Sequence, residues 1–184
     1  MKKLSEITKI GEEVVVEGLG KIRLLDTNYN GSGKKIWQFT DIVKNDVYLG
    51  YPNDENTKGY PSAKGVLKVL NDIYDKLPKW LKEQILIAKI PCYIPETKRN
   101  RLFSCKLFLL SCTELCQNGY ERPFEGRPLE YYINHCPTWK DWQWLRSPNR
   151  SYSSSAWNLN GTGTVGSYSA AYSSNAVVPA FVTD

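Results

Sequence analysis

The alternation of apolar and polar positions divides the chain into a strand-rich beginning, a helical middle and a second strand-rich region. Residues 13–25 read EVVVEGLGKIRLL, where two apolar runs flank a glycine break, and this predicts a hairpin that turns at Gly18 and Gly20. The run IWQFTDIV follows a polar turn at residues 28–33 and predicts a further strand. Residues 50–59 contain Pro, Asn and Asp and predict a loop.

Two helices are expected in the middle of the chain. Ser62–Tyr74 carries apolar residues at helical spacing, and Ser62 is a candidate N-cap. Pro78 opens a second helix, because proline is tolerated in the first turn, and this helix ends before Pro91. The expected apolar face of the second helix consists of Trp80, Leu81, Ile85 and Leu86.

Extended structure is expected to return at KIPCYI, residues 89–94, and Leu102–Leu110 predicts a buried strand. Residues 118–128 predict a loop, and residues 129–133 a short turn or helix. No linker interrupts the chain. We therefore expect one α+β domain over residues 1–184, with an N-terminal β region (1–61), a helical pair (62–90) and a β/loop region (91–184).

The composition is that of a globular protein, with 184 residues, 41% of them hydrophobic, 6 Trp and 12 Tyr. The net charge of +5 is compatible with an acidic partner but does not require nucleic acid. No apolar run is long enough to cross a membrane, so no membrane insertion is expected. The N-terminus lacks the apolar core of a secretory signal, which predicts a protein made in the cytoplasm of its host.

The five cysteines are an odd number, which favours reduced thiols. A zinc site would have to combine Cys112, Cys116, His135 and Cys136, and this is not a usual zinc spacing. We therefore expect neither a metal nor a cofactor. His135 is the only histidine, and its neighbour Cys136 is expected to point away from it, so no catalytic residue is assigned.

The most unusual segment is Ser151–Asn175, which contains no Lys, Arg, Asp or Glu. Trp157 and the turn signal Asn160-Gly161 favour order, as a series of short strands joined by polar loops. Tyr, Ser, Gly and Asn are also the residues that dominate antibody binding loops. The candidate ligand-binding residues are Tyr152, Ser154, Asn158, Asn160, Thr164, Tyr168, Tyr172 and Asn175. The alternative is that the tyrosines pack on the surface of their own domain.

Several motifs carry a resemblance to a known family. WLRSP (144–148), Ala156-Trp157, Gly161 and VVPAF (177–181) resemble the C-terminal signature of the DUF6273 family. The helical region and KLFLLSCTEL resemble its earlier segments, so the similarity extends over about residues 5–184. The family signature has Arg where this chain has Val178. If that arginine pairs with a core carboxylate in the family, the pair is absent here.

The resemblance implies a phage or prophage protein with a C-type-lectin-like fold, similar to the variable proteins of diversity-generating retroelements. In such domains the C-terminal strands and loops form a ligand-binding face on a stable scaffold. The residues implied as scaffold are Trp144, Leu145, Arg146, Pro148, Trp157, Pro179 and Phe181. A calcium-dependent sugar site is not expected, because residues 147–184 contain one acidic side chain, Asp184.

Two functions follow from these features. The first is recognition of a bacterial surface glycan or protein, for which association with the virion is expected. The alternative is an intracellular inhibitor of a host defence protein, comparable to an anti-CRISPR protein. An enzyme of the formylglycine-generating type is disfavoured because no nucleophile has an evident base. Nucleic-acid binding by Lys98, Arg99 and Arg101 beside Phe103 is also disfavoured, because so short a basic run is more often a solvated loop.

Overall fold

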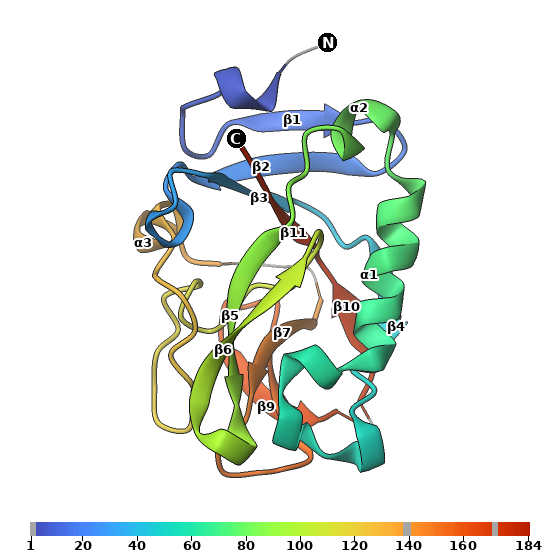
Figure 1. Ribbon diagram of the computed structural model, residues 1–184, viewed down its shortest axis with the longest axis vertical. Coiled ribbons are helices and arrows are strands. Elements are labelled where there is room, and N and C mark those ends of the chain that lie inside the picture. The colour runs from blue at the N-terminus through green and yellow to red at the C-terminus, as the bar shows by residue number, and fades with distance from the viewer. Residues whose placement is uncertain (1–2, 138–140, 171–172) are drawn as a thin grey trace.

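The computed structural model describes residues 3–137, 141–170 and 173–184 (Figure 1). The first sheet has the strand order β1-β2-β3-β11. Its strands are β1 (Glu13–Val16), β2 (Gly20–Asp26), β3 (Lys35–Phe39) and β11 (Ala180–Thr183). The predicted hairpin is confirmed, and Gly18 and Gly20 have φ values of 77° and 92°, which a residue with a side chain rarely adopts. β11 joins this sheet by antiparallel pairing with β3.

The second sheet has the order β4-β10-β7-β8-β9. Its strands are β4 (Lys44–Val47), β10 (Asn175–Val177), β7 (Gln143–Pro148), β8 (Ser155–Leu159) and β9 (Val165–Ser169). All neighbours are antiparallel except β7 and β10, which are parallel. The described part of the charge-free segment, residues 151–170 and 173–175, therefore consists of short strands joined by polar loops, as predicted. This sheet forms the lower part of the molecule in Figure 1.

A hairpin of β5 (Ala88–Ile94) and β6 (Arg99–Cys105) forms a third, two-stranded sheet. The prediction of a buried strand over 102–110 is wrong in its bounds, because the structure divides this apolar run. β6 begins before this run, at Arg99, ends at Cys105 and is largely exposed. Residues 107–110 are buried and make one isolated bridge, from Phe108 to Ala180 of β11. The predicted solvated loop at 98–101 is also wrong, since Arg99 and Arg101 belong to β6.

The helices are α1 (Lys64–Lys76), α2 (Lys79–Lys82) and α3 (Glu130–Asn134), and six 3₁₀ turns accompany them. Ser62 is not the N-cap of α1: Ala63 occupies that position, and the Ser62 hydroxyl donates to the Gly59 carbonyl at 2.8 Å. α2 is shorter than predicted, because the Leu86 backbone N–H instead donates to Val182 of β11. The 3₁₀ turns are Leu4–Glu6, Tyr29–Gly31, Pro52–Asp54, Asn56–Lys58, Tyr60–Ser62 and Pro95–Thr97.

One hydrophobic core joins the sheets and α1. All seven residues implied as scaffold by the resemblance are buried. Val178 is buried too, and the core nevertheless contains a paired carboxylate, since Glu114 forms an ion pair with Arg146. The elements confirm the coarse expectation of an α+β fold. Among the described residues, no helix has the length and apolar character that would carry it across a membrane.

Candidate functional site

The connection between β7 and β8, residues 149–154, carries two of the predicted residues, Tyr152 and Ser154, and both are exposed. Its shape is set by Asn149, whose Oδ1 accepts the backbone N–H groups of Ser151 and Tyr152 at 2.8 and 3.1 Å. The Asn149 Nδ2 donates to Ser167 of β9 at 2.7 Å. A polar loop of small residues is therefore held in one conformation, with the Tyr152 ring 63% exposed.

Asn56, which is far away in the sequence, forms hydrogen bonds with the same loop through its side chain and its backbone. Its side chain is buried, and its Nδ2 lies 3.1, 3.0 and 2.6 Å from the carbonyl oxygens of Asn149, Tyr152 and Ser155. Its backbone N–H donates to Ser153. Asn56 therefore adds to the backbone hydrogen bonds of this loop, in which the Tyr152 carbonyl also accepts the Ser155 N–H and the Ser155 carbonyl the Asn149 N–H.

Replacing Asn56 with Ala is expected to lower the free energy of unfolding by about 2 kcal/mol, because the carbonyls of Asn149, Tyr152 and Ser155 each lose a side-chain donor. Hydrogen exchange of the amides at 151–155 is expected to accelerate more than exchange in β2 and β3. Asn71→Ala, at an exposed position of α1, is the matched control. Equal acceleration throughout the molecule would contradict a local role for Asn56.

The exposed aromatic residues of the second sheet meet in one place. Trp142 directly precedes β7 and contacts Tyr168 of β9 edge to face, with ring centroids 5.1 Å apart. The two side chains are 36% and 44% exposed. They meet above Gly166, where an added Cβ would lie 2.9 Å from the Tyr168 ring and 3.4 Å from the Trp142 ring. The absence of a side chain at Gly166 therefore permits the aromatic pair to form.

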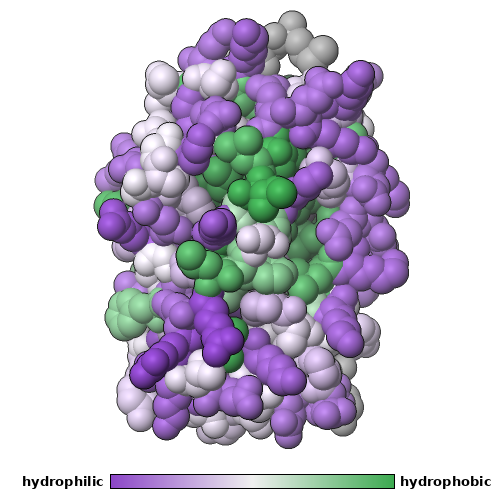
Figure 2. Space-filling view, viewed as in Figure 1, coloured by the Kyte–Doolittle hydropathy of each residue, from purple (hydrophilic) through white to green (hydrophobic). Residues whose placement is uncertain are grey.

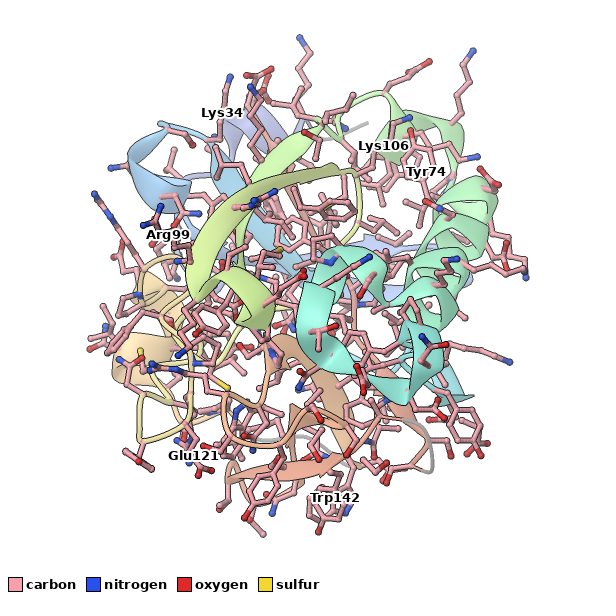
Figure 3. The ribbon with its side chains drawn as sticks, turned by 60° about the horizontal axis from the view of Figure 1, so that its bottom comes forward. Lys34, Tyr74, Arg99, Lys106, Glu121 and Trp142 are labelled. Carbon is pink, nitrogen blue, oxygen red and sulfur yellow. The ribbon has the colours of Figure 1, made fainter. Side chains whose placement is uncertain are left out.

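A polar pocket of about 340 Å³ lies beside Trp142. It is lined by Asn45, Asp46, Asp141, Trp142, Ser174, Asn175 and Ala176. The pocket lies where β4, β7 and β10 adjoin, because Asn45 and Asp46 are in β4 and Asn175 opens β10. Figure 3 shows Trp142 at the end of the molecule formed by this sheet. The lining combines an aromatic ring, two carboxylates and two amides, all capable of orienting a hydroxylated ligand.

Three buried amide atoms of this region have no protein partner among the described residues: Gln143 Nε2, Asn158 Oδ1 and Asn175 Nδ2. Asn175 lines the pocket, and Asn158 Oδ1 lies 3.2 Å from the position of a Cβ added to Gly166. A buried polar atom without a partner costs about 1–3 kcal/mol. Such atoms are retained where a bound molecule or water completes their hydrogen bonds.

The structure divides the eight predicted residues into separate groups. Tyr168 and Asn175 lie around Trp142, and Tyr152 and Ser154 lie on the loop after β7. Asn158 is only 1% exposed, so its placement on an exposed face is wrong: its side chain lies beneath the aromatic pair. Tyr172 lies outside the described residues.

Asn160 and Thr164 shape the turn between β8 and β9. The Asn160 Oδ1 accepts the backbone N–H groups of Thr162 and Thr164 at 3.0 and 2.9 Å, and the Asn160 N–H donates to the Thr164 carbonyl. The turn is thus wider than the two-residue Asn-Gly turn that the sequence suggests. Its positive-φ glycine is Gly163, at 80°. Asn160 therefore has a structural role in the turn.

Sequence reasoning missed Trp142, Asp141 and the β4 residues Asn45 and Asp46. The motif TWKDWQW contained a signal for Trp142, since it crowds three Trp residues into seven positions. No local signal identified Asn45 and Asp46, because β4 reaches β10 only through pairing across most of the chain.

A buried polar cluster surrounds the side chain of Arg146, a residue of β7 in the second sheet. The Arg146 guanidinium donates to both oxygens of Glu114, at 2.6 and 2.7 Å, and to the Leu109 carbonyl at 2.9 Å. Tyr29 donates its hydroxyl to Glu114 at 2.7 Å. These contacts fix the strand β7 that precedes the loop carrying Tyr152. Arg146 therefore supports the candidate site without touching it.

A second buried carboxyl group, Glu125, lies in the same cluster. It accepts the Tyr93 backbone N–H at 2.7 Å and hydrogen-bonds the Ser147 hydroxyl. Burial raises the pKa of Glu125 to about 7, against the opposing effect of Arg146. Burial also raises the pKa values of Cys105 and Cys112 to about 12, which keeps these thiols protonated and unreactive.

His135 was considered for catalysis, but its ring interacts with Tyr131. The His135 ring stacks on Tyr131 with centroids 4.2 Å apart, and its Nδ1 lies 2.8 Å from the Tyr131 carbonyl oxygen. All five cysteines are free thiols. Within residues 3–137, 141–170 and 173–184, no group of three His, Cys, Asp or Glu side chains is placed to hold a metal ion.

Comparisons with known proteins test the family resemblance of the C-terminal motifs. No curated protein and no solved structure matches the chain. The sequence profile described as "Domain of unknown function (DUF6273)" matches residues 41–184, a shorter span than the motifs suggested. The match covers the helices, the β5–β6 hairpin and the whole second sheet. The chain therefore belongs to the DUF6273 family.

Proposed function

We propose that this protein is a recognition protein that binds a bacterial surface glycan through the second sheet. The observation that carries the proposal is the polar pocket beside Trp142, in which an aromatic ring lies next to two carboxylates and two amides. Sugar rings present an apolar face to aromatic side chains and hydroxyl groups to carboxylate and amide oxygens. The pocket volume of about 340 Å³ lies within the range of small-ligand sites.

An unpaired amide atom supports the same proposal. Asn175 Nδ2 is a donor at the pocket and has no partner among the described residues. A hydroxyl group of a bound ligand supplies the missing acceptor. Asn158 Oδ1 is also unpaired, but Asn158 is 1% exposed and does not line the pocket. The loop that carries Tyr152 and Ser154 is held rigidly by Asn56 and Asn149, which lowers the entropic cost of binding a larger glycan across the sheet.

We further propose a phage or prophage origin and a C-type-lectin-like fold, with the protein carried on the virion. These parts rest on the resemblance of the C-terminal motifs and on the arrangement of a buried scaffold beneath polar loops. The competing proposal, an intracellular inhibitor, would use the same face to bind a protein of the host cytoplasm.

The test is binding of the purified protein to an array of bacterial surface oligosaccharides, followed by titration calorimetry with the best one. Trp142→Ala is expected to weaken binding about tenfold or more, because a central aromatic contact contributes about 1–3 kcal/mol. Tyr168→Ala is expected to weaken binding less. Tyr120→Ala removes a fully exposed aromatic ring from a different loop and is the matched control, expected to bind as the wild type does.

Two results would overturn the proposal. One is equal affinity of wild type and Trp142→Ala for every glycan that binds. The other is capture of a defined host cytoplasmic protein through Trp142 with no glycan binding, which would favour the inhibitor. Circular dichroism and thermal unfolding of each variant separate loss of binding from loss of fold.

A further inference from the structure

The strand β6 has a free edge. It pairs with β5 along its whole length, from Ile94↔Arg99 to Ala88↔Cys105, and with no other strand among the described residues. Alternate residues of an antiparallel strand direct their N–H and C=O groups away from the partner strand. Within the described part of the chain, these outward groups of β6 make no backbone hydrogen bond. Figure 1 shows the hairpin at the front of the molecule.

The hairpin is strongly basic. Arg99 and Arg101 lie on β6, and Lys98 and Lys106 lie at its two ends. None of these four cations forms an ion pair among the described residues, and Glu96 is the one acidic residue between Ala88 and Lys106. Lys106 instead donates to the Tyr74 hydroxyl at 2.9 Å and lies over its ring, as Figure 3 shows for the labelled pair.

Apolar surface flanks the same strand. One pocket of about 460 Å³ includes Leu86, Ile87 and Leu102, and another of about 370 Å³ includes Ile87 and Phe103. Ile87 and Leu102 are 67% and 68% exposed, which is unusual for side chains so apolar. Figure 2 shows the resulting hydrophobic patch, surrounded by hydrophilic residues, on the face that carries the hairpin.

We propose that β6 binds an extended segment of a protein partner as an added strand, and that acidic and apolar side chains alternate in that segment. Side chains alternate between the two faces of a strand, so Arg99 and Arg101 share one face and Leu102 lies on the other. An added strand would direct its acidic residues toward the two arginines and its apolar residues toward Leu102 and Ile87. Its backbone would pair with the free edge.

Charge, the free strand edge and the apolar surface favour the alternating peptide segment over two other partners, a second copy of the chain and a nucleic acid. A second copy of the chain would bring its own Arg99 and Arg101 against the same basic strand, which like-charge repulsion disfavours. A nucleic acid would satisfy the arginines, but it would leave the free strand edge and the exposed Ile87 and Leu102 unused. The surface is distinct from the glycan site proposed above, because β6 belongs to a different sheet from β7, β8 and β9.

The probe is a short fluorescent peptide in which Glu and Val alternate, titrated against the whole protein by anisotropy. Three controls are titrated beside it: the same residues in two blocks, the alternating peptide with N-methylated backbone amides, and a single-stranded oligonucleotide. The charge reversal Arg99→Glu/Arg101→Glu is the test variant. Lys9→Glu/Lys76→Glu changes the net charge equally at exposed positions away from β6 and is its matched control.

Binding of the alternating peptide is expected to fall about tenfold in Arg99→Glu/Arg101→Glu and to stay unchanged in Lys9→Glu/Lys76→Glu. N-methylation is expected to reduce binding by a similar factor, because the backbone can no longer pair with the edge. The proposal is overturned if the alternating peptide does not bind, or if N-methylation has no effect. Tighter binding of the oligonucleotide, lost in Arg99→Glu/Arg101→Glu, would also overturn it in favour of a nucleic-acid surface.

Discussion

Replacing Arg146 with Met is expected to lower the free energy of unfolding by about 4 kcal/mol. The guanidinium is fully buried, and without it Glu114 is left as a buried carboxylate whose remaining partners are Tyr29 and the Ser111 backbone N–H. The Leu109 carbonyl also loses a donor. Burying an unpaired carboxylate costs far more free energy than the apolar contacts of a Met side chain would contribute. Urea unfolding of both proteins at neutral pH measures the difference.

The double variant Arg146→Met/Glu114→Leu is expected to be clearly more stable than the sum of the two single changes predicts, because it removes both charges together. The matched control is Lys68→Met, which breaks the exposed ion pair with Asp72 and is expected to cost less than about 1 kcal/mol. If Arg146→Met proves as mild as Lys68→Met, the buried ion pair does not stabilise the core in the manner described.

The second large effect is a dependence of stability on pH that arises from Glu125. Its pKa is raised to about 7 from an ordinary value of 4.5, so between these values the folded protein holds more protons than the unfolded chain. The contribution of Glu125 to stability is therefore fully present below about pH 4.5 and is lost as the pH rises through about 7. At about 1.4 kcal/mol per pKa unit, the loss amounts to about 3 kcal/mol.

Glu125→Gln removes this titration and keeps the shape of the side chain. The free energy of unfolding of wild type minus that of Glu125→Gln is expected to fall by about 3 kcal/mol between pH 4.5 and pH 7.5. Subtracting the variant cancels the titration of all other groups, including Glu13, whose pKa is lowered by Arg23 and Lys21. Glu121→Gln, in the same loop, is the control. A difference that does not change with pH would show that Glu125 titrates as an ordinary carboxyl group.

The parts of the fold that depend on local sequence patterns were largely predictable. The hairpin at 13–25 follows from two β-branched or apolar runs around glycines, and both glycines adopt the positive φ that only a residue without Cβ adopts easily. The strands of the C-terminal region follow from Trp157, Asn160 and the apolar run at 177–181. The predicted bounds of α2 and β6 were wrong. Leu86 and Phe108 form backbone hydrogen bonds with β11, and the local sequence pattern does not indicate these bonds.

The candidate site was predictable only in part, for the same physical reason. Tyr152 and Tyr168 are exposed, as the composition of their segment indicated. Asn158 is buried because both faces of β8 are covered, and its neighbour across the sheet, Gly166, leaves space for the aromatic pair above it. Asn56, which holds the loop of Tyr152, stands in a segment where the sequence indicated only a polar turn. Such a contact becomes visible only in three dimensions.

The pairing of distant strands has a consequence for how fast the chain reaches its structure. β3 pairs with β11, and β4 with β10, so each of the two larger sheets joins an early segment to one of the last. Almost the whole chain must be brought together before either sheet is complete, and the entropy of closing such long loops is lost before the contacts compensate for it. Refolding from denaturant should therefore be slow, in the range of milliseconds to seconds that is typical of nonlocal β topologies. Until β10 and β11 are placed, the edges of β3 and β4 stay open to pairing with other chains, which makes high protein concentration during refolding the condition most apt to cause aggregation.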